Sequence, residues 1–167
     1  MIIGIAGVSL SGKSALAERI ELHYKDKKVK VLSQDDFVYP EDQIPKIKGH
    51  IDWECPESID FERFYKAITE HAKTNDIVIA EGLLGFNDKK INSLFDKKIF
   101  LEIPKHVFLE RKATDARWGI EPIWYREYIW KSYLKYGQLS PNMTDVLVVK
   151  GDKPADILVV TEFIERR

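Results

Sequence analysis

Residues 7–14 place two glycines, a lysine and a serine in the order used by phosphate-binding loops. The segment reads GVSLSGKS and fits the pattern G-x-x-x-x-G-K-S/T. Its glycines let backbone N–H groups turn toward phosphate oxygens, and the start of the following helix adds positive potential. The pattern predicts that Lys13 reaches the β- and γ-phosphates of a nucleoside triphosphate and that Ser14 ligates Mg²⁺. The residues predicted to bind ATP here are Gly7, Ser9, Ser11, Gly12, Lys13, Ser14 and Ala15.

Carboxylates follow two apolar segments that read as strands. Asp35 and Asp36 come directly after residues 29–32, where a carboxylate can accept the proton of an attacking hydroxyl or hold a magnesium shell. Glu81 follows the apolar run 77–80 directly. Many proteins with a phosphate loop have at this position a carboxylate that contacts Mg²⁺ through water. A solvated turn is the alternative in both places, and the nearby phosphate loop favours function.

Two further segments carry polar groups that could contact a substrate. Asp52 stands beside Trp53, and a carboxylate next to an indole suits a ribose or another polyol. A surface acid beside a core tryptophan explains the same pair equally well. Arg111 and Arg117 lie after the fourth predicted strand, where a lid could bring arginines to a transferring phosphoryl group. The alternative for this segment is a solvated helix face.

The elements that must position these residues alternate along the chain. Apolar runs predict five strands, at residues 2–6, 29–32, 77–80, 99–103 and 146–149. Amphipathic spacing predicts five helices, at residues 13–24, 61–72, 104–117, 122–137 and 154–164. We expect Asp60 to cap the second helix and Gly119 to end the third. The last helix is ambiguous because it is rich in β-branched residues. The alternation implies a parallel sheet with helices on both faces and ligands at the carboxyl ends of the strands.

Composition narrows the class of protein. The chain has 167 residues, which suits one domain spanning 1–167, and a formal net charge of −1, so nucleic acid is not an expected partner. Cys55 is the only cysteine, which excludes a disulfide within the chain. No apolar run approaches the length of a membrane span, so we expect a cytoplasmic protein without a membrane partner. The guanine motif of switch GTPases is missing. The four histidines have no ligand spacing, and the aromatic residues of 122–137 are expected to build core.

Together these motifs resemble the uridine kinase-like P-loop kinases and, within them, the nicotinamide riboside kinases. The resemblance rests on Ser33-Gln34-Asp35-Asp36-Phe37, Glu81-Gly82, Phe86-Asn87, Ile103-Pro104 and Tyr133-Leu134-Lys135-Tyr136, besides the phosphate loop, Asp52 and Arg111. It implies a three-layer P-loop NTPase fold with a five-stranded parallel sheet and a short helical lid at about 111–122. It also implies a kinase that moves the ATP γ-phosphoryl to the 5′-hydroxyl of a nucleoside-like acceptor.

The resemblance assigns roles to individual residues. Asp35 would be the base, Asp52 would bind the ribose 2′- and 3′-hydroxyls, and Ser14 and Glu81 would hold Mg²⁺. Arg111 and Arg117 would be lid arginines, and Gly151 and Lys153 would border the adenine. Asp36, Trp53 and Glu81 complete the expected substrate contacts.

The acceptor is left with alternatives. Ile51 stands where human-type nicotinamide riboside kinases have an aromatic residue that stacks on the nicotinamide, and the segment between Asp36 and Asp52 is shorter. Nicotinamide riboside is the expected acceptor, and uridine or cytidine is the alternative. A nucleotide-binding module without transfer chemistry is the alternative of another class.

Overall fold

A computed structural model describes residues 1–117 and 121–166. Five parallel strands form its main sheet in the order β2-β5-β1-β6-β7. This confirms the predicted five-stranded parallel sheet. The strands are β1 (Ile2–Gly7), β2 (Val29–Ser33), β5 (Ile77–Gly82), β6 (Lys97–Glu102) and β7 (Val146–Lys150).

All five predicted helices are present, but the bounds of three differ by more than one residue: the third ends before Arg117, Tyr133–Gly137 of the fourth form a π-helix, and the last begins at Ile157 in place of 154. The helices are α1 (Lys13–His23), α2 (Phe61–Ala72), α3 (Lys89–Asn92), α4 (Lys105–Thr114), α5 (Ile123–Ser132) and α6 (Ile157–Glu165). The short helix α3 was not predicted. The prediction of a helix to Arg117 is wrong, because Asp115 is extended and its side chain instead accepts hydrogen bonds from Arg117. The predicted break at Gly119 lies outside the described residues.

The ambiguous last segment is a helix, as predicted. Asp156 accepts a hydrogen bond from the backbone N–H of Leu158, and this cap starts the helix. The turns of α6 then bury Val160 and Ile164 against the sheet. None of the helices among residues 1–117 and 121–166 is long and apolar enough to cross a bilayer.

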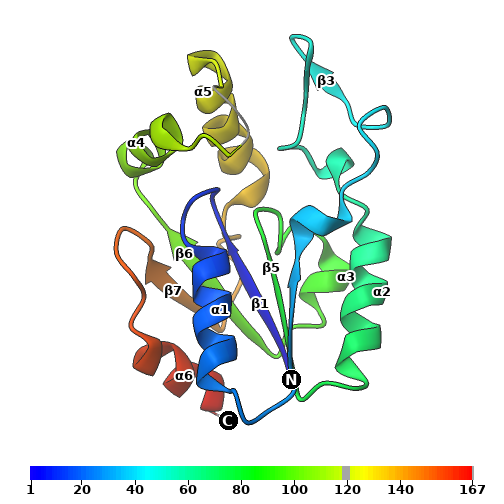
Figure 1. Cartoon of the computed structure of the whole chain (residues 1–167), viewed down its shortest axis with the longest axis vertical. Helices are drawn as coiled ribbons and strands as arrows, with labels where there is room; N and C mark the ends of the chain where they lie inside the picture. The colour runs from blue at the N-terminus through cyan, green and yellow to red at the C-terminus, as the bar shows by residue number, and fades with distance from the viewer. Residues whose placement is uncertain (118–120, 167) are drawn as a thin grey trace.

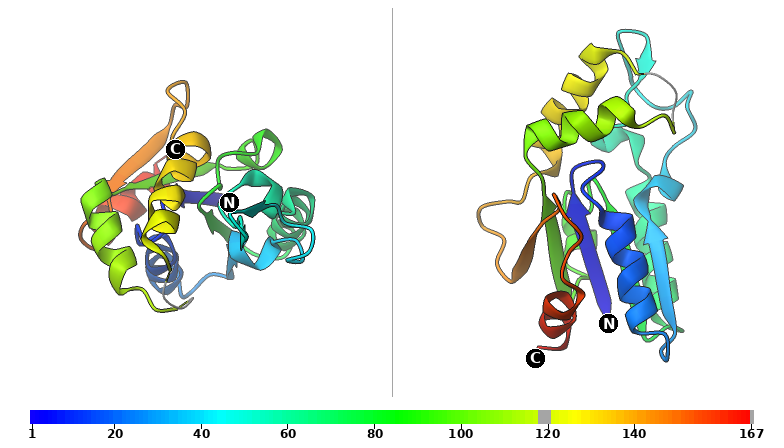
Figure 2. Two further views of the ribbon diagram at one scale, coloured as in Figure 1. Left: turned by 90° about the horizontal axis from the view of Figure 1, so that it is seen from above. Right: turned by 60° about the vertical axis from the view of Figure 1, so that its left-hand side comes forward.

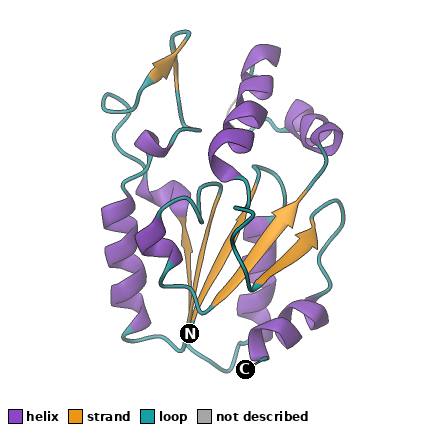
Figure 3. Ribbon diagram, turned by 180° about the vertical axis from the view of Figure 1, so that it is seen from behind, coloured by secondary structure: helices purple, strands orange, loops and turns teal. Residues whose placement is uncertain are grey.

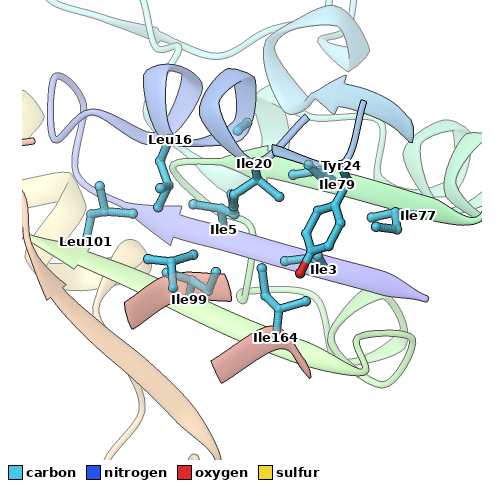
Figure 4. Packing of buried hydrophobic residues seen from close by; sticks show 12 residues of the cluster. Ile3, Ile5, Leu16, Ile20, Tyr24, Ile77, Ile79, Ile99, Leu101 and Ile164 are labelled. Atoms are coloured by element: carbon cyan, nitrogen blue, oxygen red, sulfur yellow. The ribbon is translucent and has the colours of Figure 1, made fainter. Parts of the chain in front are cut away.

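Alternating side chains of the central strands build a core on each face of the sheet. On one face, residues of β1, β5 and β6 pack against Leu16 and Ile20 of α1 and Ile164 of α6 (Figure 4). On the other face, Val78 and Ala80 pack under α2 and α3. The result is the expected three-layer arrangement (Figure 3).

The carboxyl ends of the strands all point to one end of the molecule. The loop after β1, the helices α4 and α5, and a small hairpin lie at this end, while both termini lie at the other (Figures 1 and 2). The hairpin pairs β3 (Lys46–Ile47) with β4 (His50–Ile51), and its turn places Gly49 at a φ of 82°. It lies in the connection between β2 and α2, which also contains the 3₁₀ turns η1 (Gln34–Phe37) and η2 (Pro56–Ser58).

Candidate active site

The loop between β1 and α1 has the tight path that phosphate binding requires. Gly7 and Gly12 have φ values of 147° and 96°, which other residues rarely adopt. A Cβ atom on Gly7 would lie 2.4 Å from the carbonyl oxygen of Leu101. No side chain caps the start of α1, so its first backbone N–H groups face this loop. The geometry fits a bound phosphate group.

Lys13, Ser14 and Glu81 meet at the end of the loop. The Ser14 hydroxyl donates to Glu81 Oε1 at 2.9 Å, and the Lys13 ammonium donates to the carbonyl oxygen of Val8 at 3.2 Å. Burial lowers the pKa of Lys13, while the negative charges of Glu81, Asp35 and Glu54 act in the opposite direction. The Ser14 and Glu81 oxygens therefore lie together, as a magnesium site would need.

Asp35 is placed beside this group by its neighbour Gln34. Ser33 pairs in register with Glu81, so β2 delivers the turn η1 to the end of β5. The buried Gln34 side chain accepts a hydrogen bond from the backbone N–H of Leu84 at 2.9 Å. It fills the space over Gly82, where a Cβ atom would lie 2.4 Å from the Gln34 side chain. This anchor holds Asp35 at the strand ends with an exposed carboxylate.

Asp36 and Trp53 were also predicted to contact the substrate. Both side chains are exposed, and no described residue makes a hydrogen bond to the Asp36 carboxylate, whose backbone oxygen accepts from Arg63. Trp53 is 37% exposed, and the Asp36 carboxylate is open to solvent.

Asp52 is the buried acid of the second substrate segment. Its Oδ2 accepts a hydrogen bond from the Tyr128 hydroxyl at 2.5 Å, and its Oδ1 accepts from the backbone N–H of Glu54 at 3.2 Å. The Cys55 thiol donates to the Asp52 carbonyl oxygen, which fixes the backbone here. Burial is the main cause that raises the pKa of Tyr128 to about 12, and its bond to Asp52 adds to the shift.

The aromatic residues of α5 form a wall over Asp52 that sequence reasoning did not assign to the site. Tyr125 is buried, as expected for core, but its hydroxyl donates to the carbonyl oxygen of Ile51. His50, which was given no role, stacks on Tyr125 with ring centroids 5.7 Å apart and meets Trp124 edge-on at 5.1 Å. The spacing of Tyr125 and Tyr128 on one helix face was the signal that could have indicated this wall.

The two predicted lid arginines have different environments. Arg111 donates to three backbone carbonyl oxygens, those of Leu10 and Gly151 at 2.8 Å and that of Asp152 at 2.9 Å. Arg117 pairs with both oxygens of Asp115, and its charge acts on Asp35 and Lys13. Arg117 thus lies near enough to Asp35 and Lys13 for its charge to act on them, whereas Arg111 joins the phosphate loop to the loop after β7.

Gly151 and Lys153 lie on that second loop. Gly151 packs so closely on the phosphate loop that a Cβ atom would lie 2.3 Å from the Ser11 carbonyl oxygen. Lys153 is exposed. The loop therefore borders the phosphate loop, as expected of residues next to a nucleotide.

Sequence comparison finds relatives over most of the chain. Residues 67–115 match the model of the phosphoribulokinase/uridine kinase family. The chain is 31% identical to human nicotinamide riboside kinase 1 over 94% of its own length and 87% of that protein. It is 28% identical to a uridine kinase of Schizosaccharomyces pombe over 98% of its length and 44% of that protein.

Solved structures share the fold. A gluconokinase from Sinorhizobium meliloti superposes with a TM-score of 0.62 at 18% identity, covering 96% of this chain and 87% of that one. At this identity the likeness concerns the fold alone.

Proposed function

Because the chain belongs to the phosphoribulokinase/uridine kinase family, we propose that it phosphorylates the 5′-hydroxyl of a ribonucleoside with ATP, and that nicotinamide riboside is its acceptor. The single observation that carries this proposal is the position of Asp35. Its carboxylate lies near enough to Lys13 of the phosphate loop and to Arg117 for its charge to act on both. A base in that position serves a hydroxyl that attacks a phosphoryl group.

Other side chains bind the acceptor and stabilise the transferring phosphoryl group in the proposed reaction. Asp52 binds the ribose 2′- and 3′-hydroxyls, and Tyr128 orients the Asp52 carboxylate. The acceptor is thereby held with its 5′-hydroxyl near Asp35, which takes the proton as the hydroxyl attacks. Lys13 and Arg117 stabilise the negative charge that spreads over the transferring phosphoryl oxygens.

Magnesium fits the oxygen pair at the end of the phosphate loop. Ser14 and Glu81 would hold the ion, which neutralises charge on the ATP phosphates when it is bound. In the described part of the chain, no group of three His, Cys, Asp or Glu side chains is arranged so that it could hold a metal ion. Phosphate oxygens would therefore supply several of the ligands.

The proposal includes a moving segment. Residues 111–122 would act as the lid of a single kinase domain, 1–167, and Arg117 would be its arginine at the phosphates. Closing it would exclude water and limit ATP hydrolysis. A cytoplasmic location remains an expectation from composition.

A panel of acceptors tests the proposed function. Purified protein with ATP and Mg²⁺ should release ADP in the presence of nicotinamide riboside, faster than with uridine or cytidine. Faster release with uridine or cytidine would favour a pyrimidine nucleoside kinase. Tight ATP binding without ADP release for any acceptor would favour the nucleotide-binding module.

Replacing Arg111 by lysine should raise the KM for ATP by about tenfold while the acceptor KM changes little. A single ammonium group cannot bond three carbonyl oxygens in the fork that a guanidinium provides, so Leu10, at a φ of 62°, would lose its support. Steady-state kinetics with each substrate varied in turn measure this. Glu110→Gln, an exposed neighbour on α4, is the control. A fall in kcat at unchanged ATP KM would instead support the predicted contact with the transferring phosphoryl group.

A further inference from the structure

The space between the Asp52 segment and the end of α4 holds more buried acids than bases. Lys112 is only 6% exposed, and its ammonium lies 3.0 Å from Glu121 and 3.6 Å from Asp115. Glu54 lies near the same lysine, because the charge of Lys112 acts on it more strongly than any other charge. One ammonium group thus pairs with two carboxylates and lies near a third.

Glu54 has a carboxylate oxygen for which the described residues provide no hydrogen-bond donor. Its Oε2 is buried and finds no hydrogen-bond partner among the described residues, and the same holds for Oε2 of Glu121. A buried carboxylate oxygen without a donor is costly, so such an oxygen indicates a group that arrives with the substrate. The position of Glu54, two residues after Asp52, places it beside the proposed ribose contact.

The surrounding charges would favour an added positive charge. Burial raises the pKa of Glu54 to about 8, Lys112 opposes the shift, and Asp35, Asp52 and Glu121 add to it. The charge of Glu54 also acts on Tyr125 of α5 and on Lys13 of the phosphate loop. ATP cannot supply the missing positive charge because its phosphates are anionic, even with one Mg²⁺ bound.

We propose that Glu54 makes this site prefer an acceptor whose ring carries a positive charge, a ribosylpyridinium, over a neutral ring of the same shape. The inference rests on the proposed kinase function and adds the property by which the acceptor is chosen. The pyridinium nitrogen of nicotinamide riboside carries that charge, whereas pyrimidine nucleosides are neutral. Two opposite unit charges about 7 Å apart, at an effective dielectric constant of about 20, attract each other by more than the free energy of a tenfold preference.

Dihydronicotinamide riboside is the matched probe, because it is neutral and has nearly the same shape as nicotinamide riboside. The measured quantity is the ratio of kcat/KM for the cationic acceptor to kcat/KM for the neutral one. At about pH 9, where Glu54 is charged, Glu54→Gln should lower this ratio about tenfold. Glu54→Asp, which keeps the charge, should retain most of it. Glu57→Gln, an exposed acid on the same segment, should leave the ratio unchanged and is the control.

The pH dependence of the wild-type protein provides a second measurement that needs no variant. Glu54 is neutral below its raised pKa of about 8 and charged above it, so the preference for the cation should grow as the pH rises through that value. Taking the ratio of two acceptors cancels titrations that affect the turnover of both. In Glu54→Gln the ratio should no longer change between about pH 7 and about pH 9.

Three results would separate the possibilities. A ratio that is the same at about pH 9 in the wild type and in Glu54→Gln would overturn the inference and leave the kinase function intact. A wild-type ratio that is flat across the pH range would overturn it too, even if the glutamine variant failed to fold. Absence of turnover with every nucleoside would instead refute the proposed function itself.

Discussion

Replacing Asp35 by asparagine is expected to lower kcat by about 10³-fold or more while ATP binding survives. Asparagine has nearly the same shape, so the turn that Gln34 anchors should persist, but an amide cannot accept the proton of the 5′-hydroxyl. A positioned general base contributes about 10²–10⁴-fold to rate. The variant also removes a negative charge near Lys13, which should not weaken the binding of anionic ATP.

The measurement pairs acceptor-dependent ADP release with the Kd for ATP determined by calorimetry. Asp42→Asn, an exposed acid in the following loop, is the matched control and should keep wild-type turnover. Asp36→Asn is informative beside it, because an equal loss there would show that the two adjacent acids share the role. Full activity of Asp35→Asn would remove it from the mechanism.

Replacing Asp52 by asparagine should lower kcat/KM for the acceptor by about 10²-fold or more and leave the KM for ATP nearly unchanged. Hydrogen bonds to a charged group contribute about 1.5–3 kcal/mol each, and the proposal assigns two ribose hydroxyls to this carboxylate. The carboxylate is 7% exposed, so water cannot easily replace the lost partner. Tyr128 would then face an amide in place of its charged acceptor.

A deoxy acceptor identifies which contact is lost. Removing the 2′-hydroxyl from the acceptor should cost the wild-type protein about tenfold or more in kcat/KM, and should cost Asp52→Asn much less. Tyr128→Phe should have a smaller effect than Asp52→Asn, because it removes only the bond that orients the carboxylate. If the deoxy acceptor is penalised equally in the wild type and in Asp52→Asn, then Asp52 does not bind the 2′-hydroxyl.

Local features of the chain were predicted well because they depend on neighbouring residues. Short apolar runs indicated all five strands of the sheet, and helical spacing of apolar residues indicated every helix longer than one turn. The phosphate loop was predicted from its glycines, because its turn needs backbone conformations that glycine adopts readily, as the positive φ of Gly12 shows. The errors were local too: two-residue strands such as β3 and the short α3 are too brief to produce a periodic pattern.

Contacts between distant segments were beyond the reach of such patterns. Tyr128 bonds Asp52 across 76 positions of sequence, and Arg111 bonds Leu10 across 101. Spacing gave no sign that the Arg111 guanidinium would donate to backbone carbonyl oxygens. Its place after a strand predicted a contact with the transferring phosphoryl group. The charges around Glu54 likewise include those of Lys112 and Glu121, which lie on another part of the chain.

By itself, the sequence determined that this chain forms a parallel α/β sheet with a phosphate loop at Gly7 and acids at the ends of its strands. These features follow from backbone preferences and from the periodicity of burial, which short stretches of sequence encode. Only the tertiary structure decided which side chains share the acceptor end of the site. Their neighbours there, and hence their hydrogen bonds and charge balance, are set by how β5, η1, α4 and α5 come together in space.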